Sequence, residues 1–367
     1  MSTPAAGHQG CAATRSLPPA SPGAQAEGYA GPVEAWLHTF AFPHRVAETA
    51  RVAEAWGFGG LLVADSQNLN ADVWVEVGLA GAATERMAVG PGVTNPVTRH
   101  PAVTASAAAT VQAETEGRAV LGLGRGDSAL TQIGRKPVSA HALEEALVAI
   151  QALLRGEEAE FDGAASHLGW VAERDEPKVP VTVAATGPKV IAAAAKHAER
   201  IDFSVGAEPE RLRWAIETAG QAAPDRRPSL GAYLNVAVHP DKGTARDLVR
   251  GSTAIFARFA TEGAPADGLS QATREGIARL SEDYDESRHG RAGAAHARAL
   301  EDDFIDRFAV VGPAAEVAER INELGDVGIE RVVVVPGSLD ADPELVAESN
   351  AAFAQEVLPA LRGGPAA

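Results

Sequence analysis

Eight segments with the character of β-strands recur along this chain, and each is followed by sequence that predicts a helix. The strands are expected over residues 33–40, 60–64, 87–92, 118–123, 179–184, 201–205, 229–238 and 331–335. The segment GLLVA at 60–64 is apolar on both faces, as in a buried parallel strand. Eight strand–helix units without a dividing linker predict an α/β fold, a (β/α)8 TIM barrel, with a doubly wound sheet as the alternative.

The predicted barrel occupies residues 32–362 as a single domain and carries one insertion. Residues 241–306, between the seventh and eighth strands, are polar and predict helices without strands. Residues 157–177 predict a second, shorter irregular stretch. Residues 1–31 are rich in Ala, Pro and Gly and predict a disordered tail, and residues 363–367 predict a short C-terminal tail.

The net charge of −17, from 32 basic and 49 acidic residues, argues against nucleic acid or an anionic membrane surface as the main partner. No apolar run is long enough to span a membrane, and the N-terminus lacks the pattern of a secretory signal, so we expect a cytoplasmic protein. The one cysteine, Cys11, excludes an intramolecular disulfide. The ten histidines form no ligand motif, so no metal is expected.

In a barrel the active site lies at the C-terminal ends of the strands, so the residues just after each strand are the candidates. After the second strand, Asp65 and Ser66 either face a ligand or cap the next helix. After the third strand, GPGVTNP at 90–96 holds two glycines and two prolines, which indicate a constrained backbone. Thr94 and Asn95 in this loop can hydrogen-bond a polar ligand, and a plain tight turn is the alternative.

After the fourth strand comes GLGRGDS at 122–128, which is not a dinucleotide fingerprint because Asp127 stands where the third glycine would be. The loop nevertheless places Gly124, Arg125, Asp127 and Ser128 at the mouth of the barrel. Arg125 can pair with a ligand anion or with Asp127. Helix capping is the structural alternative for Asp127 and Ser128.

A phosphate site is expected after the fifth strand, where a helix begins with a glycine and a proline. The residues are Thr186, Gly187, Pro188 and Lys189. The free N–H groups of such a helix start favour anions, and Lys189 adds positive charge. After the sixth strand, Gly206 and Ala207 offer a second point of close approach. His38 is expected in the core or at its rim, and His100 either faces the pocket or has a structural role.

Several of these blocks together resemble the luciferase-like monooxygenase superfamily. They are VADSQN at 63–68, VGPGVTNPVTRHPAVTASA at 89–107, RAVLGLGRGDSAL at 118–130, the segment 185–215 that begins ATGPKV, and FAVVGPAAEVAERI at 308–321. Within this superfamily, the sequence blocks most resemble the coenzyme F420-dependent branch, which is similar to methylenetetrahydromethanopterin reductases. The resemblance covers residues 33–361, except 241–306, where it is faint.

The resemblance implies a barrel with an insertion region, usually a homodimer, that binds coenzyme F420 at its C-terminal mouth. It places Asp65 and Ser66 near the deazaflavin ring, and it matches Gly92, Val93 and Thr94 to a bulge that often carries a non-prolyl cis peptide bond. It matches the turns at 186–189 and 206–207 to the phosphate site. Asp127 falls where some relatives have a glutamate proposed as proton donor, so the resemblance implies a catalytic role for Asp127, with contact to substrate or cofactor as the alternative.

The function expected from the resemblance is an F420H2-dependent reductase that transfers a hydride to a small organic substrate with a C=C, C=N or C=O bond. Transfer in the opposite direction, substrate oxidation, stays open. An FMN-dependent monooxygenase and a non-catalytic flavin-binding protein are the alternatives. Tyr233 and Asn235 on the seventh strand and the insertion are expected to line the pocket.

Overall fold

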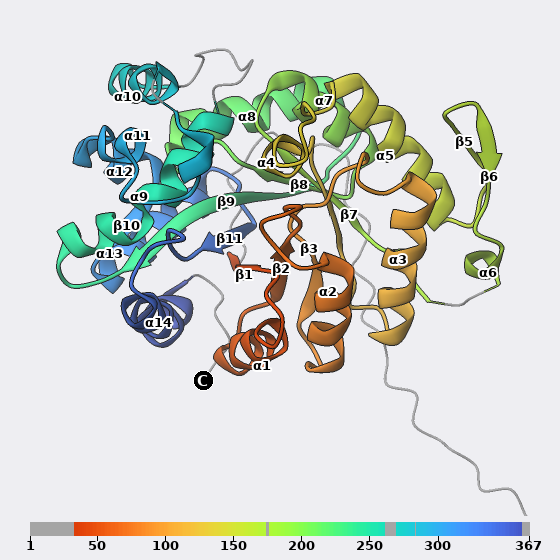
Figure 1. Ribbon diagram of the computed structural model, residues 1–367, viewed down its shortest axis with the longest axis horizontal. Coiled ribbons are helices and arrows are strands. Elements are labelled where there is room, and N and C mark those ends of the chain that lie inside the picture. The colour runs from red at the N-terminus through yellow and green to blue at the C-terminus, as the bar shows by residue number, and fades with distance from the viewer. Residues whose placement is uncertain (1–32, 174–175, 261–268, 283, 362–367) are drawn as a thin grey trace, which may run out of the picture.

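The computed structural model describes residues 33–173, 176–260, 269–282 and 284–361, so the predicted tails and Cys11 lie outside it. In the described chain, eight parallel strands form a nearly closed barrel in the order β3-β2-β1-β11-β9-β8-β7-β4 (Figure 1). The barrel strands are β1 (Glu34–Phe40), β2 (Gly60–Ala64), β3 (Ala88–Pro91), β4 (Leu121–Leu123), β7 (Val181–Ala185), β8 (Arg200–Phe203), β9 (Ser229–Val238) and β11 (Arg331–Val335). The predicted TIM barrel is therefore confirmed.

The barrel closes between β3 and β4, where two glycines let the backbones approach closely. Bridge pairs join Val89 to Ala119 and Thr94 to Leu123. A Cβ added at Gly90 would lie 1.9 Å from the carbonyl oxygen of Val120. A Cβ at Gly122 would lie 2.3 Å from the carbonyl oxygen of Pro91. Any side chain at either position would push the two strands apart, next to the loops that form the site.

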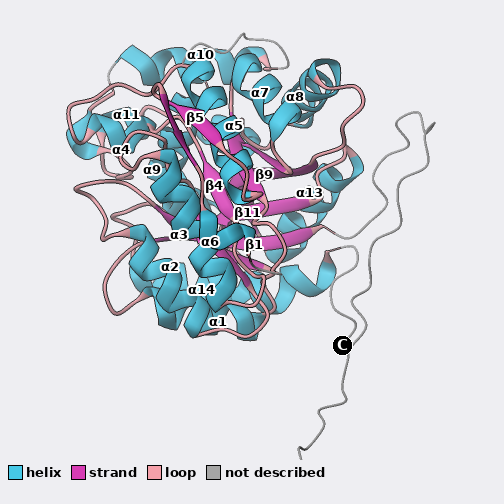
Figure 2. Cartoon of the chain, turned by 90° about the vertical axis from the view of Figure 1, so that its right-hand side faces the viewer, coloured by secondary structure: helices cyan, strands magenta, loops and turns pink. Residues whose placement is uncertain are grey.

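Helices surround the strands on all sides, as Figure 2 shows. They are α1 (Val46–Trp56), α2 (Val73–Ala82), α3 (Pro101–Glu114), α4 (Asp127–Thr131), α5 (Ala140–Leu154), α7 (Pro188–His197), α8 (Pro209–Ala222), α13 (Ala314–Asp326) and α14 (Pro343–Ala352). Asp72 caps α2 and Ser139 caps α5, and proline occupies the first turn of α3, α7, α8 and α14. None of the described helices is both long and apolar enough to cross a membrane.

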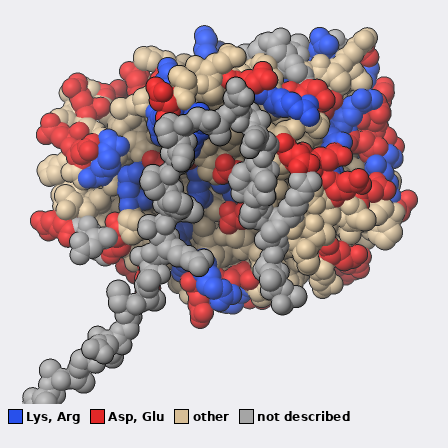
Figure 3. All heavy atoms as spheres, turned by 180° about the vertical axis from the view of Figure 1, so that it is seen from behind, with Lys and Arg blue, Asp and Glu red and all other residues tan. Residues whose placement is uncertain are grey.

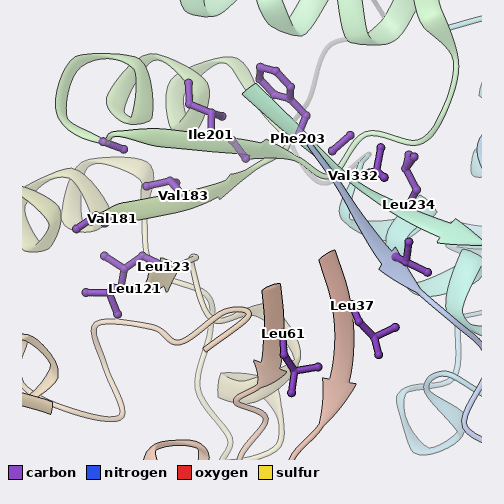
Figure 4. Close-up of a cluster of buried hydrophobic side chains, with 14 of the residues drawn as sticks. Leu37, Leu61, Leu121, Leu123, Val181, Val183, Ile201, Phe203, Leu234 and Val332 are labelled. Carbon is purple, nitrogen blue, oxygen red and sulfur yellow. The ribbon is translucent and has the colours of Figure 1, made fainter. Parts of the chain in front are cut away.

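The strands bury both faces, which accounts for their continuous apolar runs. The layer between strands and helices is shown in Figure 4 and contains Leu37, Leu61, Leu121, Leu123, Val181, Val183, Ile201, Phe203, Leu234 and Val332. Residues next to these in sequence, such as Trp36, Leu62 and Val333, pack in a separate cluster with Tyr233. This alternation is the period of two expected for a strand, with one set facing the helices and the other the barrel interior.

The insertion folds as helices at the C-terminal side of β9, as predicted. They are α9 (Lys242–Phe259), α10 (Gln271–Glu282), η1 (Glu286–Arg288), α11 (Ala295–Arg298) and α12 (Asp302–Phe308), followed by the short strand β10 (Val310–Gly312) beside β9. Arg246 and Arg250 of α9 pair with Asp306 and Asp302 at 2.7 and 2.8 Å. In the view from behind in Figure 3, acidic and basic side chains crowd the edge that holds α9, α12 and α13 in Figure 1.

Two predictions of local structure were wrong. The stretch 157–177, expected to be irregular, contains the antiparallel hairpin β5 (Ala159–Phe161) and β6 (Ala164–Ser166), followed by α6 (Gly169–Ala172). The sequence also predicts one last helix over residues 343–361, but α14 ends at Ala352. The chain continues as the π-helical turn η2 (Phe353–Val357) and the 3-10 turn η3 (Leu358–Ala360), in which Pro359 has no N–H to donate to an α-helical hydrogen bond.

Candidate active site

A cavity of about 170 Å³ opens at the C-terminal ends of the barrel strands. A single buried water molecule needs only ~10–15 Å³, so the cavity has room for a much larger ligand. Of the predicted site residues, it is lined by Asp65, Ser66, Gly92, Val93, Gly124, Arg125, Asp127, Ser128 and Thr186. These come from the ends of β2, β3, β4 and β7, which is the geometry that the strand-end rule anticipated.

The loop after β3 forms one wall of the cavity. Its Gly92–Val93 peptide bond is cis, as the family resemblance implies. The Gly92 N–H donates to the Val63 carbonyl at 2.7 Å, and the Gly92 carbonyl oxygen lies 3.0 Å from His38 Nε2. A Cβ at Gly92 would lie 2.5 Å from Leu62 Cβ, so glycine is required for this close packing. Backbone and side-chain contacts thus hold the wall from both sides.

Asp65 lines the cavity, but its carboxylate is engaged by protein groups. Thr94 Oγ1 donates to Asp65 Oδ2 at 2.6 Å and Arg99 Nη1 donates to the same oxygen at 3.0 Å. Gln67 Nε2 donates to the other oxygen at 2.6 Å. Capping was the alternative for Asp65, and it is wrong because α2 is capped by Asp72. Asp65 instead ties the loop after β2 to the loop after β3.

Thr94 and Asn95 lie beneath the cavity rather than on its surface. Thr94 is completely buried and Asn95 nearly so. The Asn95 side-chain oxygen accepts hydrogen bonds from the Val97 and Thr98 N–H groups, both at 3.0 Å. Both side chains therefore shape the loop. The sequence predicted the loop correctly, but it could not separate residues that hold the loop from residues that face the ligand.

The loop after β4 meets the insertion at the cavity. Capping by Ser128 was the structural alternative and is wrong, because α4 begins after Gly126, which has a φ of 86° and supplies no side chain. Ser128 Oγ instead lies 3.0 Å from Nε2 of His289 in the insertion. Arg125 also lines the cavity, and its Nε donates to the Val138 carbonyl at 2.6 Å.

Two histidines in the cavity wall are held neutral near pH 7. Burial lowers the pKa of His38 to about 4, outweighing the hydrogen bond to Gly92 that favours the charged form. Burial also lowers the pKa of His289 to about 4, and the charges of Arg258 and His296 act in the same direction. Burial raises the pKa of Tyr233, whose ring lies 6.1 Å from that of His38. His38, His289 and Tyr233 thus offer uncharged donors and acceptors to the cavity.

The predicted phosphate site is only partly at the cavity surface. Thr186 lines the cavity, and Gly187 stands at the N-terminus of the ten-residue helix α7 without a capping side chain. The first turn of a helix presents N–H groups that favour an anion. Lys189 is exposed beside this turn. Gly206 and Ala207 do not line the cavity, and the close approach at Gly206 is made by the Phe308 ring.

The histidines and β9 residues divide between cavity and scaffold. His38 was expected in the core or at its rim, and it lines the cavity with only 8% of its surface exposed. His100 caps α3 through Nδ1, which confirms the structural role. Tyr233 lines the cavity, whereas Asn235 is buried without lining it.

The insertion supplies cavity residues that were not identified individually from the sequence. They are Ser252, Ile255, Phe256 and Phe259 of α9, with His289 before α11. The spacing of Ser252, Ile255, Phe256 and Phe259 is that of one helix face, so this part of the wall had a signal in the sequence. His289 had none, because its partner Ser128 lies 161 residues away along the chain. Among the residues that the structure describes, no group of three or more side chains is arranged to hold a metal ion.

Comparisons with known proteins agree with this architecture. Residues 22–331 match the family described as luciferase-like monooxygenase. The chain is 29% identical to a 5,10-methylenetetrahydromethanopterin reductase of Archaeoglobus fulgidus, over 77% of this chain and 86% of that protein. It is 30% identical to an F420-dependent glucose-6-phosphate dehydrogenase of Microbacterium testaceum, over 57% of this chain and 68% of that protein.

The fold is shared with a solved structure. The coenzyme F420-dependent tetrahydromethanopterin reductase of Methanopyrus kandleri superposes with a TM-score of 0.71 at 23% identity, covering 89% of this chain and 99% of that one. The family match extends over most of the described barrel and includes every loop that lines the cavity from the strand ends. The chain therefore belongs to the luciferase-like monooxygenase family.

Proposed function

We propose that this protein is a coenzyme F420-dependent oxidoreductase that transfers a hydride between the deazaflavin C5 and a small organic substrate with a C=C, C=N or C=O bond. The cavity at the barrel mouth carries the proposal, because it combines an apolar wall with polar atoms that lack protein partners. His38 Nδ1 and the Tyr233 hydroxyl are buried and unpartnered within the described chain. Such atoms favour a ligand with polar groups on its edge. The names of the relatives support F420 over FMN.

The residues present fit a flat ring with a phosphorylated side chain. Gly92 and Val93 line the cavity from the loop after β3, and Ile255 and Phe256 line it from the insertion, so the wall is largely apolar. The start of α7 offers N–H groups for a phosphate. When bound, the deazaflavin would supply or accept the hydride. The protein would then contribute orientation, exclusion of water and proton transfer.

The cofactor is tested by anaerobic titration of the purified protein with F420 and with FMN. We expect F420 to bind at least about tenfold more tightly, which corresponds to ~1.4 kcal/mol. Reduced F420 would then be offered with acetone and methylenetetrahydromethanopterin. Oxidised F420 would be offered with isopropanol and glucose 6-phosphate to test the opposite direction. Binding of FMN alone, with oxygen consumption, would support the monooxygenase instead, and cofactor binding without any turnover would support a non-catalytic flavin-binding protein.

A matched pair of glycine variants locates the binding site. A Cβ at Gly124 would lie 2.7 Å from Val93 Cγ2, so Gly124→Leu should displace the Val93 wall and weaken F420 binding by about tenfold or more. Gly220 lies on exposed α8 with nothing within 4 Å of an added Cβ, so Gly220→Leu should bind F420 normally. Equal affinities for the two variants would place the cofactor elsewhere.

We also propose a homodimer formed through α2 and α3. The outward face of α2 consists of apolar or small residues that are all exposed, namely Val75, Gly78, Leu79 and Ala82. Val75 is 61% and Leu79 49% exposed, and Val103 in the neighbouring α3 is 55% exposed. On a chain with a net charge of −17, an uncharged stripe of this kind is a surface on which two copies can meet.

The dimer is tested by light scattering after size-exclusion chromatography. We expect the native protein to have the mass of two copies and Leu79→Glu to have the mass of one, because a charge in the centre of an apolar interface is unpaired. Val148 is similarly exposed at 45% but lies on α5, so Val148→Glu should stay dimeric. A native protein with the mass of one copy at micromolar concentration contradicts the proposal.

A further inference from the structure

Three polar side chains form a hydrogen-bonded chain that leads out of the cavity into the insertion. Ser128 Oγ lies 3.0 Å from His289 Nε2, and the Tyr284 hydroxyl lies 2.7 Å from His289 Nδ1. Ser128 and His289 line the cavity, whereas Tyr284 lies behind them and is partly exposed. Both ring nitrogens of one imidazole are therefore in contact with a hydroxyl, one on the cavity side and one on the outer side.

The outer end of this chain is placed beside positive charge. The Arg258 guanidinium lies 4.5 Å from the centre of the Tyr284 ring, and the His296 ring stacks on the same Tyr284 ring at a centroid distance of 4.2 Å. These ring contacts hold the Tyr284 side chain in place at the outer end of the chain.

The segment that carries His289 is held firmly against its surroundings. A Cβ at Gly251 of α9 would lie 2.5 Å from the Ala292 backbone nitrogen, so α9 packs directly on this segment. On the other side the Leu339 N–H donates to the Gly290 carbonyl at 2.8 Å. Backbone packing on both sides keeps the imidazole between its two hydroxyl partners.

We propose that Ser128, His289 and Tyr284 form a proton relay for the substrate atom bonded to the carbon that gains the hydride. The proposal rests on the proposed function, since it assigns the proton that a hydride transfer to C=N or C=O requires. As the carbon gains hydride, the heteroatom takes the Ser128 hydroxyl proton, and Ser128 takes a proton from His289 Nε2. His289 Nδ1 takes the Tyr284 proton, and water restores it. Substrate oxidation runs the same transfers in reverse.

A neutral imidazole suits this role because it holds one proton and one lone pair on opposite nitrogens. The low pKa of His289, about 4, keeps the ring neutral throughout the range in which the enzyme would work. Among the side chains that the structure describes, the charged and titratable groups around it include Arg258 on α9, His296 on α11, Tyr284 and, on α4 beside Ser128, Asp127. Asp127 is the competing proton donor at this position in the barrel.

The hydrogen-bonded chain is tested without cofactor by NMR of the full-length protein labelled with 15N-histidine. We expect a neutral His289 ring whose pKa lies below 5, well under the ordinary 6.5. Ser128→Ala should shift the Nε2 resonance and Tyr284→Phe the Nδ1 resonance, while His141→Gln, at an exposed position on α5, should shift neither. A His289 ring that titrates near 6.5 and responds to neither variant overturns the relay.

The role in proton transfer is tested with whichever carbonyl or alcohol the F420 assays identify. Ser128→Ala should lower kcat about 10²-fold with little change in KM, and Ser128→Thr should recover most of it because the hydroxyl returns. Tyr284→Phe keeps the ring but should lower kcat and reduce the solvent deuterium isotope effect.

Full loss of activity in Asp127→Asn, with a normal kcat in Ser128→Ala, would assign the proton to Asp127. Absence of F420 binding would refute the proposed function and leave the NMR result to decide whether the chain exists.

Discussion

Replacing Arg331 by methionine is expected to lower the free energy of unfolding by about 3–5 kcal/mol, because it leaves a carboxylate buried without its counter-charge. Arg331 Nη2 lies 2.6 Å from Asp202 Oδ1, and the two side chains are only 3% and 1% exposed. Removing one partner of a buried ion pair lowers the free energy of unfolding strongly, because the remaining charge then has neither water nor a partner. Replacing both partners by apolar side chains changes it much less.

The geometry shows why this pair forms inside the barrel. Asp202 on β8 and Arg331 on β11 are both register partners of Gly231 on β9, so the three residues form one row across three strands. A Cβ at Gly231 would lie 2.1 Å from the Asp202 carboxylate. The glycine therefore leaves the space in which the two side chains meet. The Arg331 guanidinium also lies 5.3 Å from the centre of the Trp36 ring, which favours the cation further.

Denaturant unfolding monitored by tryptophan fluorescence measures this effect. The double variant Asp202→Leu with Arg331→Met should recover most of the lost stability, because neither charge is then buried. Arg279 pairs with Glu301 at 3.2 Å on the surface, where both side chains are well exposed, so Arg279→Met should cost less than ~1 kcal/mol. If Arg331→Met proves as stable as the surface control Arg279→Met, water reaches the Asp202 carboxylate in the variant.

The strands could be predicted closely because they are buried on both faces. β2, β9 and β11 have the predicted bounds, and each is a continuous or alternating run of apolar residues. The hairpin β5–β6 was missed although its turn had a signal. Asp162 and Gly163 lie between the two strands with φ values of 55° and 74°, as an Asp-Gly hairpin turn requires. Its strands are too short for the alternation to be visible, so only the turn could have shown it.

The sequence could predict which loops reach the candidate site, but not the side-chain contacts that form between loops. The strand-end rule found Ser66, Val93 and Thr186 because topology brings all strand ends to one mouth. It could not show that the Asp65 carboxylate binds Arg99 and Thr94, since which partner a carboxylate chooses depends on packing. The same limit applies to Gly206, whose close neighbour is Phe308, an aromatic ring from the insertion rather than a ligand.

Acid should destabilise this protein between pH 6.5 and 4.5, before the pH falls below the ordinary glutamate pKa of 4.5. His38 and His289 are neutral in the folded state, and burial holds the pKa of each at about 4. In the unfolded chain both return to 6.5, so below that pH the unfolded state binds more protons. Stability is complete above pH 6.5 and falls as the pH drops towards 4.

The expected loss is about 2–3 kcal/mol for each histidine at pH 4.5, from ~1.4 kcal/mol per pKa unit. Glu54 and Glu199 also have lowered pKa values in the fold. Burial opposes this shift. Backbone N–H groups overcome it at Glu54, and the Val181 N–H with the Gln151 and Lys178 side chains overcome it at Glu199. Their contribution is also lost as the pH falls, but at lower pH, because it is present above the ordinary glutamate pKa of 4.5 and is lost as the pH falls from there through the lowered value. Most of the window from 6.5 to 4.5 therefore reports the histidines.

The measurement is the free energy of unfolding at four pH values from 7.5 to 4.5. His38→Gln and His289→Gln should each remove about half of the slope, and together nearly all of it, whatever they do to stability at pH 7.5. His141 is 80% exposed, and His141→Gln should leave the slope unchanged. A slope that survives unchanged in the double variant would show that other groups carry it and that burial does not lower the pKa of either ring, although His38 supports the Gly92 carbonyl and His289 contacts Ser128. The His289 ring would then titrate near 6.5, and the low pKa that keeps it neutral in the proposed proton relay would be absent.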